Sequence, residues 1–405
     1  MEEKKQVFAD LHIHSRYSRA CSKNITIENL VKYAKIKGLG LLGTGDFTHP
    51  IWLKEIKEKL VEKQGLYFLG DFPFILTGEI SLMYTQGKGR RIHLVLLAPN
   101  LEVVDKINSY LDTKGRRDYD GRPIFKISCE EFTREMMRIS GNIEIICAHS
   151  WTPYFGVFGS MSGFDSLKEA FGSQIDNIHA IETGMSSDPE MNWKISELNN
   201  KTIVSFSDSH SFWPWRLGRE ATIFEKVECY DYIINAIRNN KILATIETSP
   251  GYGKYHWDGH ANCNFSCSPE KTRELGGICP ICGKPLTIGV ENRVEKLTSQ
   301  ETYQYPNKKP FYTLLPLHEL IALAKASSLA TRKTWLVYNN LIEKFGNEFN
   351  ILLNISETEL MKALPNDKLL VQLIINNRIG NIRVQPGFDG QYGIPLLKER
   401  QSTLI

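Results

Sequence analysis

Short apolar runs alternate with segments of helical spacing from the N-terminus to about residue 250. This alternation is typical of parallel strands joined by crossover helices, and it predicts an α/β fold. The number of units suits a barrel of seven or eight βα repeats, with a doubly wound open sheet as the alternative. We expect strands at Val7 to His14, Leu39 to Asp46, Phe74 to Glu79, Ile92 to Leu97, Ile143 to His149, Ile178 to Glu182, Ile203 to Asp208 and Ala221 to Phe224, and helices at Thr26 to Lys37, Ile51 to Lys63, Glu130 to Ile139 and Glu190 to Asn199.

Beyond Pro250 the chain changes character twice. Residues 251–305 are rich in Gly, Cys and turn-forming residues, which indicates a small module that is not held together by an apolar core. From residue 306 the spacing becomes helical, with helices expected at 317–326 and 333–345, and with Ser356 and Glu359 placed as a capping box. The expected units are therefore 1–250, 251–305 and 306–405.

Composition excludes some classes of protein. The 405 residues are 42% hydrophobic and 23% charged, as in a globular protein. No run approaches the roughly 20 apolar residues that cross a bilayer, and the start of the chain lacks the apolar core of a secretion signal. We therefore expect a cytoplasmic monomer with no membrane partner. The formal net charge of +3 is too small to indicate nucleic-acid binding by itself.

Six of the ten histidines lie in or directly after the expected strands. In a βα barrel the strand ends meet at one mouth, so side chains that are distant in sequence come together there. His12 and His14 are two residues apart on a strand, so both imidazoles point to the same side, and Asp208 and His210 repeat this spacing. The candidate metal ligands are His12, His14, Asp46, His49, Glu79, His93, His149, Asp208 and His210.

A mixed set of imidazoles and carboxylates suits Zn, Mn or Fe better than Ca, which prefers oxygen ligands alone. The set exceeds the three or so ligands that one ion needs, so we expect more than one ion, with Glu79 or Asp208 as a bridge. Taken alone, a histidine such as His93 is more often a hydrogen-bonded core residue than a metal ligand. For the whole set this explanation fails, because burying so many polar groups without partners would be unfavourable. We interpret Glu182 as a contact behind the ligands and His318 as a surface residue.

In order along the chain, these residues resemble the metal motifs of the PHP (polymerase and histidinol phosphatase) superfamily. The motifs are His-x-His, an Asp and a His after the second strand, Gly-Glu, a strand His, a further His and Asp-x-His, and they cover about Phe8 to Gly218. The resemblance implies a distorted (βα)7 barrel that holds two or three divalent ions (Zn2+, Mn2+ or Mg2+) and hydrolyses phosphoesters. Asp46 and His49 are separated by two residues where the superfamily has them adjacent, so either can be the ligand.

Four cysteines are bunched in the module as Cys263-x3-Cys267 and, after eleven residues, Cys279-x2-Cys282. Two thiolate pairs at this spacing are typical of a tetrahedral structural zinc site. His256 and His260 lie nearby and could replace one cysteine, but four thiolates would leave no vacancy. We therefore expect a four-cysteine Zn2+ site.

The order of a PHP-like barrel, a four-cysteine module and a helical tail ending in PGFDGQYG resembles the endonuclease Q family of DNA repair enzymes. This resemblance implies a lesion-specific endodeoxyribonuclease. It would bind DNA that contains hypoxanthine, uracil, xanthine or an abasic site, and would hydrolyse the phosphodiester on the 5′ side of the lesion. Glu79, Asp208, His210 and Arg216 would be catalytic, and the helical tail would be a DNA-binding domain.

Aromatic and basic residues near the expected ligands are candidates for DNA contacts. A base that leaves the stack needs rings to stack on, and phosphates need cations. Arg216 and Arg219, close behind His210, are the better candidates for the scissile phosphate. The alternative is that the rings anchor loops on the barrel and that the basic loops are a solvated face. The candidates are Arg90, Arg91, Trp151, Tyr154, Phe155, Phe212, Trp213, Arg216 and Arg219.

Two other functions stay open at this stage. A small-molecule phosphatase of the histidinol phosphatase type would use the same barrel, but it would not need the module and the tail. A nucleic-acid binding protein with an inactive barrel would not need the complete ligand set.

Overall fold

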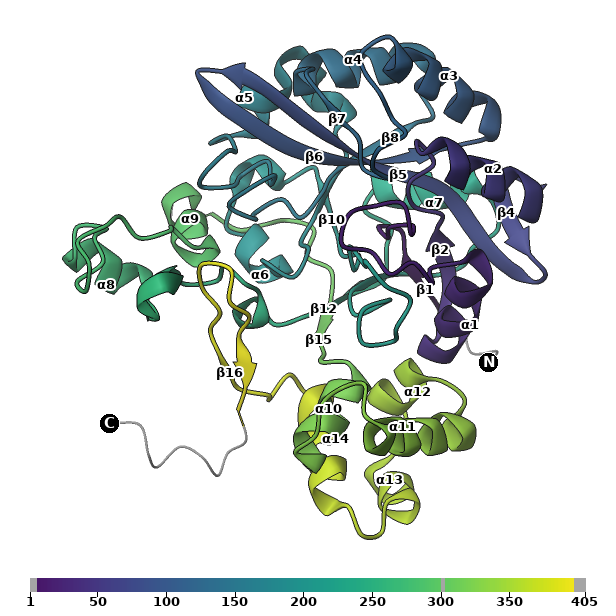
Figure 1. Cartoon of the computed structure of the whole chain (residues 1–405), viewed down its shortest axis with the longest axis vertical. Coiled ribbons are helices and arrows are strands. Elements are labelled where there is room, and N and C mark those ends of the chain that lie inside the picture. The colour runs from purple at the N-terminus through teal and green to yellow at the C-terminus, as the bar shows by residue number, and fades with distance from the viewer. Residues whose placement is uncertain (1–5, 300–302, 397–405) are drawn as a thin grey trace.

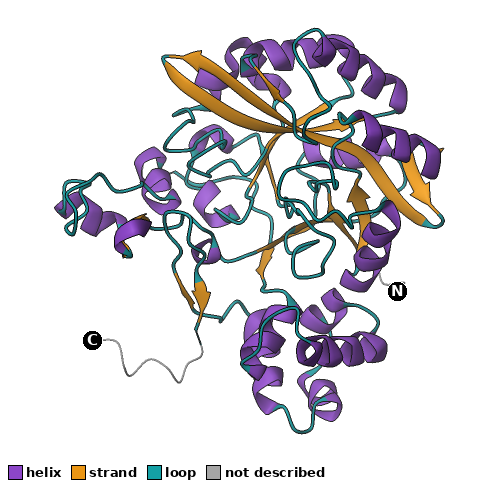
Figure 2. Ribbon diagram, viewed as in Figure 1, coloured by secondary structure: helices purple, strands orange, loops and turns teal. Residues whose placement is uncertain are grey.

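A mixed, curled β-sheet forms the centre of the computed structural model, which describes residues 6–299 and 303–396 (Figures 1 and 2). Its main path runs β10-β9-β8-β6-β5-β2-β1-β11-β12-β15. In chain order these strands are β1 (Val7–Asp10), β2 (Leu39–Gly43), β5 (Phe72–Gln86), β6 (Lys88–Ala98), β8 (Glu144–Cys147), β9 (Ala180–Glu182), β10 (Thr202–Val204), β11 (Ala221–Phe224), β12 (Ala244–Glu247) and β15 (Phe311–Thr313). Short side strands β3 (Val61–Lys63), β4 (Leu66–Leu69) and β7 (Ile124–Phe125) pair outside this path.

The α/β class is confirmed, but the sheet is not made of parallel strands alone. β5 and β6 form a long antiparallel hairpin, and β1 pairs with β11 in the antiparallel sense. Only Gly87, in left-handed backbone with φ of 69°, separates β5 from β6. A parallel connection needs a crossover of a dozen or more residues, so a one-residue link can only reverse the chain.

Two loops bring the first and last strands of the ligand-bearing region together. Ile13, after β1, forms a parallel bridge with Ser209, after β10, and the His14 N–H donates to the Ser209 carbonyl over 2.9 Å. The segments after β1 and β10 therefore meet, although five strands separate β1 from β10 in the sheet order.

Helices cover the sheet and mostly begin at a side-chain cap. Thr26 caps α1 and Ser128 caps α4, each by accepting the backbone N–H three residues on. The expected helix over 190–199 is wrong: the segment holds only the end of the four-residue α6 and a 3-10 turn at Ser196–Leu198. The helices are α1 (Ile27–Lys37), α2 (Pro50–Lys59), α3 (Leu101–Asp112), α4 (Cys129–Ile139), α5 (Leu167–Phe171), α6 (Pro189–Asn192) and α7 (Tyr230–Arg238).

Three smaller parts follow the sheet region. The Cys/His module comprises the ribbon of β13 (Asp258–His260) and β14 (Phe265–Cys267), α8 (Pro269–Glu274) and the turn to Leu286, and α9 (Val290–Leu297) leads back to the sheet. A short hairpin of β16 (Val384–Gln385) and β17 (Ile394–Pro395) ends the described chain. In Figure 1 the module lies to one side of the sheet region.

The helical region comprises residues 317–378 and lies below the sheet region in Figure 1. The expected capping box is confirmed, since Ser356 and Glu359 exchange side-chain and backbone hydrogen bonds at the start of α13. None of the helices in the described ranges is long and apolar enough to span a bilayer. The helices are α10 (Leu317–Lys325), α11 (Arg332–Phe345), α12 (Glu348–Leu353), α13 (Glu357–Ala363) and α14 (Lys368–Arg378).

Candidate metal centre

Most of the predicted ligands lie at or just beyond strand ends on neighbouring strands. Asp46, His149 and Asp208 follow β2, β8 and β10, and each has a positive φ, between 30° and 47°. Left-handed backbone is unfavourable for residues other than glycine and persists where the surrounding structure holds it in place. The chain therefore turns sharply at these positions, and the three side chains point to a common site.

One group of side chains brings together His12, His14, Glu79 and Asp208, with one ligand atom of each within 4.8 Å of the others. His14 Nε2 lies 3.2 Å from Glu79 Oε2 and 3.0 Å from Asp208 Oδ1. His12 Nε2 lies 3.6 Å from an oxygen of each carboxylate and makes no hydrogen bond to any described residue. A buried nitrogen without a partner, facing two carboxylates, fits a divalent ion as its partner.

A second group consists of Glu79, His93 and His149. Glu79 Oε1 lies 2.7 Å from His93 Nδ1 and 3.2 Å from His149 Nε2, whereas its other oxygen faces His12 and His14. One carboxylate thus faces both groups, as expected for a bridge between two ions.

Two further carboxylates orient the imidazoles from behind. Glu182 lies 2.9 Å from His12 Nδ1 and also accepts the His149 N–H, and Asp46 lies 2.9 Å from His14 Nδ1. Such contacts fix the ring orientation and leave Nε2 available for a metal. Between the two residues of the second motif, Asp46 is the one that reaches the centre, whereas His49 stacks on Tyr17 with ring centroids 4.3 Å apart.

His210 lies beside these groups without belonging to them. Its ring is 4.5 Å from that of His14, and its Nδ1 lies 3.0 Å from the backbone carbonyl of Asp208. Neither His210, Asp46 nor His49 takes part in the groups of ligand atoms found in the described chain. Their role as direct metal ligands stays a prediction.

The charges in the centre are strongly coupled. Burial opposes protonation of His12 and His14, yet the neighbouring carboxylates raise the pKa of both imidazoles well above its usual value. Burial would raise the pKa of Glu79, but His93, Arg122 and His12 hold it well below the usual range. Burial lowers the pKa of His93 to about 4, which keeps this imidazole neutral. Glu79 is therefore ionised, as a carboxylate that binds a metal must be.

A cavity of about 700 Å3 opens above the centre. Its lining includes His93, His149, Asp208 and His210, together with Arg122, Arg216 and Arg219. Arg122 was missed by the sequence analysis: its Nη1 lies 3.1 Å from Glu79 Oε2, and it is three-quarters buried. The only sequence signal was its place at the end of a basic segment, GRRDYDGR, which is also typical of an exposed loop.

Three of the predicted DNA-contacting side chains are buried in the structure. Trp151 is fully buried, stacks on Phe158 and donates from Nε1 to Asn192. Arg90 is 7% exposed and bonds Glu169 and backbone carbonyls, and Phe212 is 4% exposed. These residues anchor loops, which is the alternative that the sequence left open.

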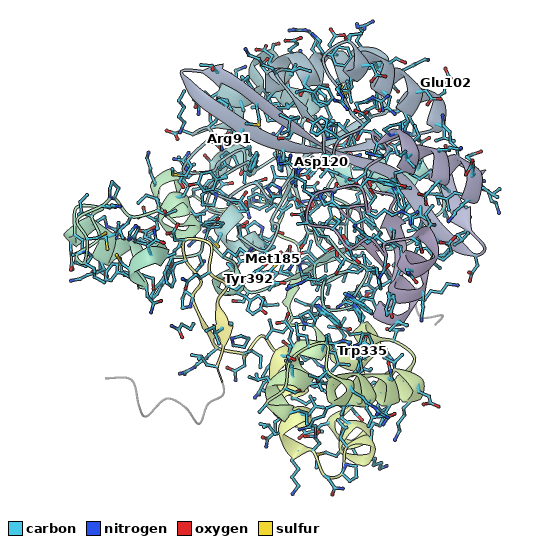
Figure 3. The ribbon with its side chains drawn as sticks, in the orientation of Figure 1. Arg91, Glu102, Asp120, Met185, Trp335 and Tyr392 are labelled. Atoms are coloured by element: carbon cyan, nitrogen blue, oxygen red, sulfur yellow. The ribbon has the colours of Figure 1, made fainter. Side chains whose placement is uncertain are left out.

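The other candidates lie closer to the surface. Tyr154, Phe155, Arg216 and Arg219 line the cavity, and Phe155 stacks on His93 with ring centroids 4.3 Å apart. Arg91 is exposed on β6, away from the lining (Figure 3), and Trp213 is half-buried. The sequence analysis missed Tyr255 and Tyr392, which also line the cavity. Tyr392 lies in the PGFDGQYG segment, which supported the family resemblance but was not predicted to contribute to the site.

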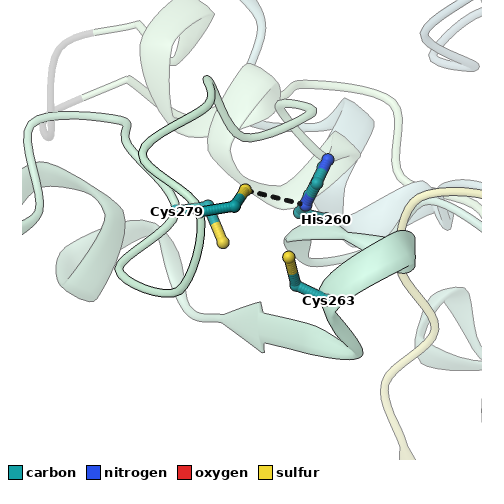
Figure 4. Close-up of side chains that lie close together, drawn as sticks. His260, Cys263 and Cys279 are labelled. Carbon is teal, nitrogen blue, oxygen red and sulfur yellow. Dashed lines mark hydrogen bonds between the residues drawn. The ribbon is translucent and has the colours of Figure 1, made fainter.

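The module gathers His260, Cys263, Cys279 and Cys282 rather than four cysteines (Figure 4). His260 Nδ1 lies 3.5 Å from Cys282 Sγ. Cys267 lies opposite Asp258 on the β13–β14 ribbon, and its Sγ contacts the Thr272 hydroxyl. Three thiolates and one imidazole still make a tetrahedral zinc set, so the metal prediction stands with one ligand exchanged.

Known structures match nearly the whole chain. The crystal structure of the lesion-specific endonuclease PfuEndoQ from Pyrococcus furiosus has 28% identity and a TM-score of 0.86, and covers 99% of this chain and all of that one. An endonuclease Q in complex with a 27-mer duplex that carries an abasic lesion has 30% identity and a TM-score of 0.88, with 99% of both chains covered. The chain belongs to the endonuclease Q family.

Two curated proteins are also similar to this chain in sequence. YqxK of Bacillus subtilis is 25% identical over 409 residues, which cover 96% of this chain and 99% of YqxK. MJ0043 of Methanocaldococcus jannaschii is 31% identical over 288 residues, which are 69% of this chain but only 34% of that protein. The model of the MJ0043 C-terminal domain matches residues 316–381, which include the whole helical region. The functions of YqxK and MJ0043 are uncharacterized.

Proposed function

We propose that this member of the endonuclease Q family is a metal-dependent endonuclease of DNA repair. It binds duplex DNA with a deaminated base (hypoxanthine, uracil or xanthine) or an abasic site, and it hydrolyses the phosphodiester 5′ to the lesion. The observation that carries the proposal is the pair of ligand groups joined by Glu79 under a cavity lined by three arginines. The related endonuclease Q bound to duplex DNA with an abasic lesion at its active site supports this substrate class.

Different residues of the site would bind the metal ions, the DNA phosphates and the unstacked base. The ions would be held by His12, His14, Glu79, Asp208, His93 and His149, and they would supply Lewis acidity and a lowered pKa of bound water. Arg122, Arg216 and Arg219 bring cationic groups to the cavity, where they would bind the phosphates of the DNA backbone. Tyr154, Tyr255 and Tyr392 offer rings in the same lining for an unstacked base. The module would hold its own structural Zn2+.

The test offers the protein three kinds of substrate in the presence of Mn2+, Mg2+ or Zn2+. The first is a duplex with one deoxyinosine, deoxyuridine or abasic site, the second is the same duplex without a lesion, and the third is a generic phosphomonoester. We expect one cut on the 5′ side of the lesion and intact undamaged duplex. Hydrolysis of the monoester alone would instead show a small-molecule phosphatase, and binding without any cleavage would show an inactive barrel.

A further inference from the structure

The segment 211–218 connects the metal centre to the helical region. It begins directly after His210 and ends before Arg219, and its Arg216 lines the cavity. Its Trp213 and Trp215 instead contact the helical region. One short segment therefore contacts both the active-site cavity and a separate part of the molecule.

The contact with the helical region is aromatic. Trp213 and Trp215 stack with ring centroids 5.4 Å apart and an interplanar angle of 7°. Trp335 of α11 meets both rings edge-on, at 5.6 Å and 5.7 Å. His318 of α10 lies 4.8 Å from Trp215. In Figure 3, Trp335 lies at the edge of the helical region that faces the sheet region.

A buried lysine joins the same parts through polar contacts. Lys37, the last residue of α1, is 1% exposed, and its Nζ donates to the Pro214 carbonyl over 2.8 Å and to Glu348 Oε1 over 2.7 Å. Glu348, at the start of α12, is fully buried and also accepts the Leu317 N–H and the Tyr338 hydroxyl. Such a charge pair is favourable only when its remaining hydrogen bonds are satisfied, as they are here.

Backbone hydrogen bonds connect the anchored residues of this segment to Arg216. The N–H groups of Arg216 and Leu217 both donate to the Trp213 carbonyl, over 2.8 Å and 2.9 Å. Pro214 and Trp215 form the middle of this turn, and they are the residues that Lys37 and the helical region hold. A shift of the turn would therefore move the Arg216 guanidinium relative to the cavity.

We propose that the helical region positions Arg216 for binding the scissile phosphate, with Lys37, Glu348 and Trp335 as positioning residues. This role rests on the proposed nuclease function, and it is separate from any DNA contact that the helical region makes. A loop that carries a phosphate-binding arginine needs a rigid support, because a displacement of about 1 Å can reduce a rate about a hundredfold.

The test uses the full-length protein with the double variant Lys37→Met/Glu348→Gln. Replacing both partners removes the charge pair without leaving one buried charge alone, so the chain should stay folded. We expect kcat for lesion cleavage to fall between about tenfold and a hundredfold, while the melting temperature and the Kd for the duplex change little. Lys35→Met is the matched control, because Lys35 lies on the same helix and its side chain is 49% exposed.

A double-mutant cycle separates positioning from general destabilisation. If Lys37 and Glu348 act through Arg216, the double variant should lower kcat by less than about twofold in an Arg216→Ala background. Trp335→Leu should behave in the same way, and it replaces the double variant in the cycle if that protein does not fold. Losses that multiply in the Arg216→Ala background, or an unchanged kcat in both variants, would overturn the proposal.

Hydrogen exchange tests the inference even if the wild-type protein cuts none of the duplexes. In the double variant, and equally in Trp335→Leu, the amides of Arg216 and Leu217 should exchange faster, while those of α14 keep their protection. Unchanged exchange at these amides would contradict the inference, whereas absent cleavage by the wild type would contradict only the proposed nuclease function.

Discussion

The two candidate metal sites are built in opposite ways. The centre in the sheet region joins residues as far apart in the chain as His12 and Asp208, and its imidazoles are oriented by buried carboxylates. The module joins residues within 22 positions, and its buried apolar cluster consists of Cys267, Cys279 and Leu286. The first site is thus held by the fold, whereas the second must help to hold its own part of the fold.

Glu79→Gln should have the largest effect, because Glu79 faces both groups of the sheet centre. We expect cleavage to fall by at least about a thousandfold and metal analysis to show loss of the centre's ions, with the module's ion retained. The melting temperature should change little if the fold holds the centre without its ions. Glu102→Gln, at the surface (Figure 3), is the control. Nearly normal turnover in Glu79→Gln would contradict the assignment of Glu79 as the residue that bridges the two groups of ligands.

Cys279→Ser should show the reverse pattern. Loss of a thiolate should weaken metal binding in the module by more than about a hundredfold, because loss of an outer contact alone weakens sites by up to that factor. Hydrogen exchange should then be fast throughout β13, β14 and α8, while the sheet region keeps its protection. A variant that retains a full equivalent of zinc and a protected module would contradict the view that the metal supports this part.

His260→Ala and Cys267→Ser form a matched pair that tests which residue is the fourth ligand of the module. His260→Ala should lose the module's metal as Cys279→Ser does. Cys267→Ser should retain it and lose only about 1 kcal/mol of stability from the buried contact with Thr272. The opposite result for zinc content would restore the four-cysteine site that the spacing suggested.

His318 contrasts with the imidazoles of the sheet centre, because burial lowers its pKa whereas neighbouring carboxylates raise the pKa of His12 and His14. It is fully buried among Trp215, Trp335 and Tyr338, and burial lowers its pKa from 6.5 to about 3. Because the unfolded chain takes up this proton first, its contribution to stability should be complete above pH 6.5. It should decrease by up to about 1.4 kcal/mol per pH unit as the pH falls from about 6.5 towards 3.

Urea unfolding of the wild type and of His318→Phe at several pH values measures this contribution. The difference in unfolding free energy between them should shift in favour of the variant as the pH falls. Parallel pH curves for the two proteins would show that His318 takes up no proton on unfolding in this range.

Much of the sheet centre was predictable because each ligand is next to an apolar run. His12, His14, Glu79 and Asp208 were all named from their places at strand ends, and the fold brings them within reach of one ion. The antiparallel β5–β6 hairpin was less visible, since apolar runs do not reveal strand direction. The burial of Trp151 and His318 was not predictable either. The local sequence around an aromatic ring does not reveal whether a distant segment of the chain packs over it.

Periodicity and residue type were enough to predict the α/β class, the helical region and two clusters of possible metal ligands, because these depend on local patterns along the chain. Tertiary structure decided the partners: Asp46 rather than His49 beside His14, His260 rather than Cys267 in the module, and Arg122 beside Glu79. Those choices depend on register, turn geometry and packing between distant segments, which set side-chain distances to within an ångström and leave no mark in a local pattern.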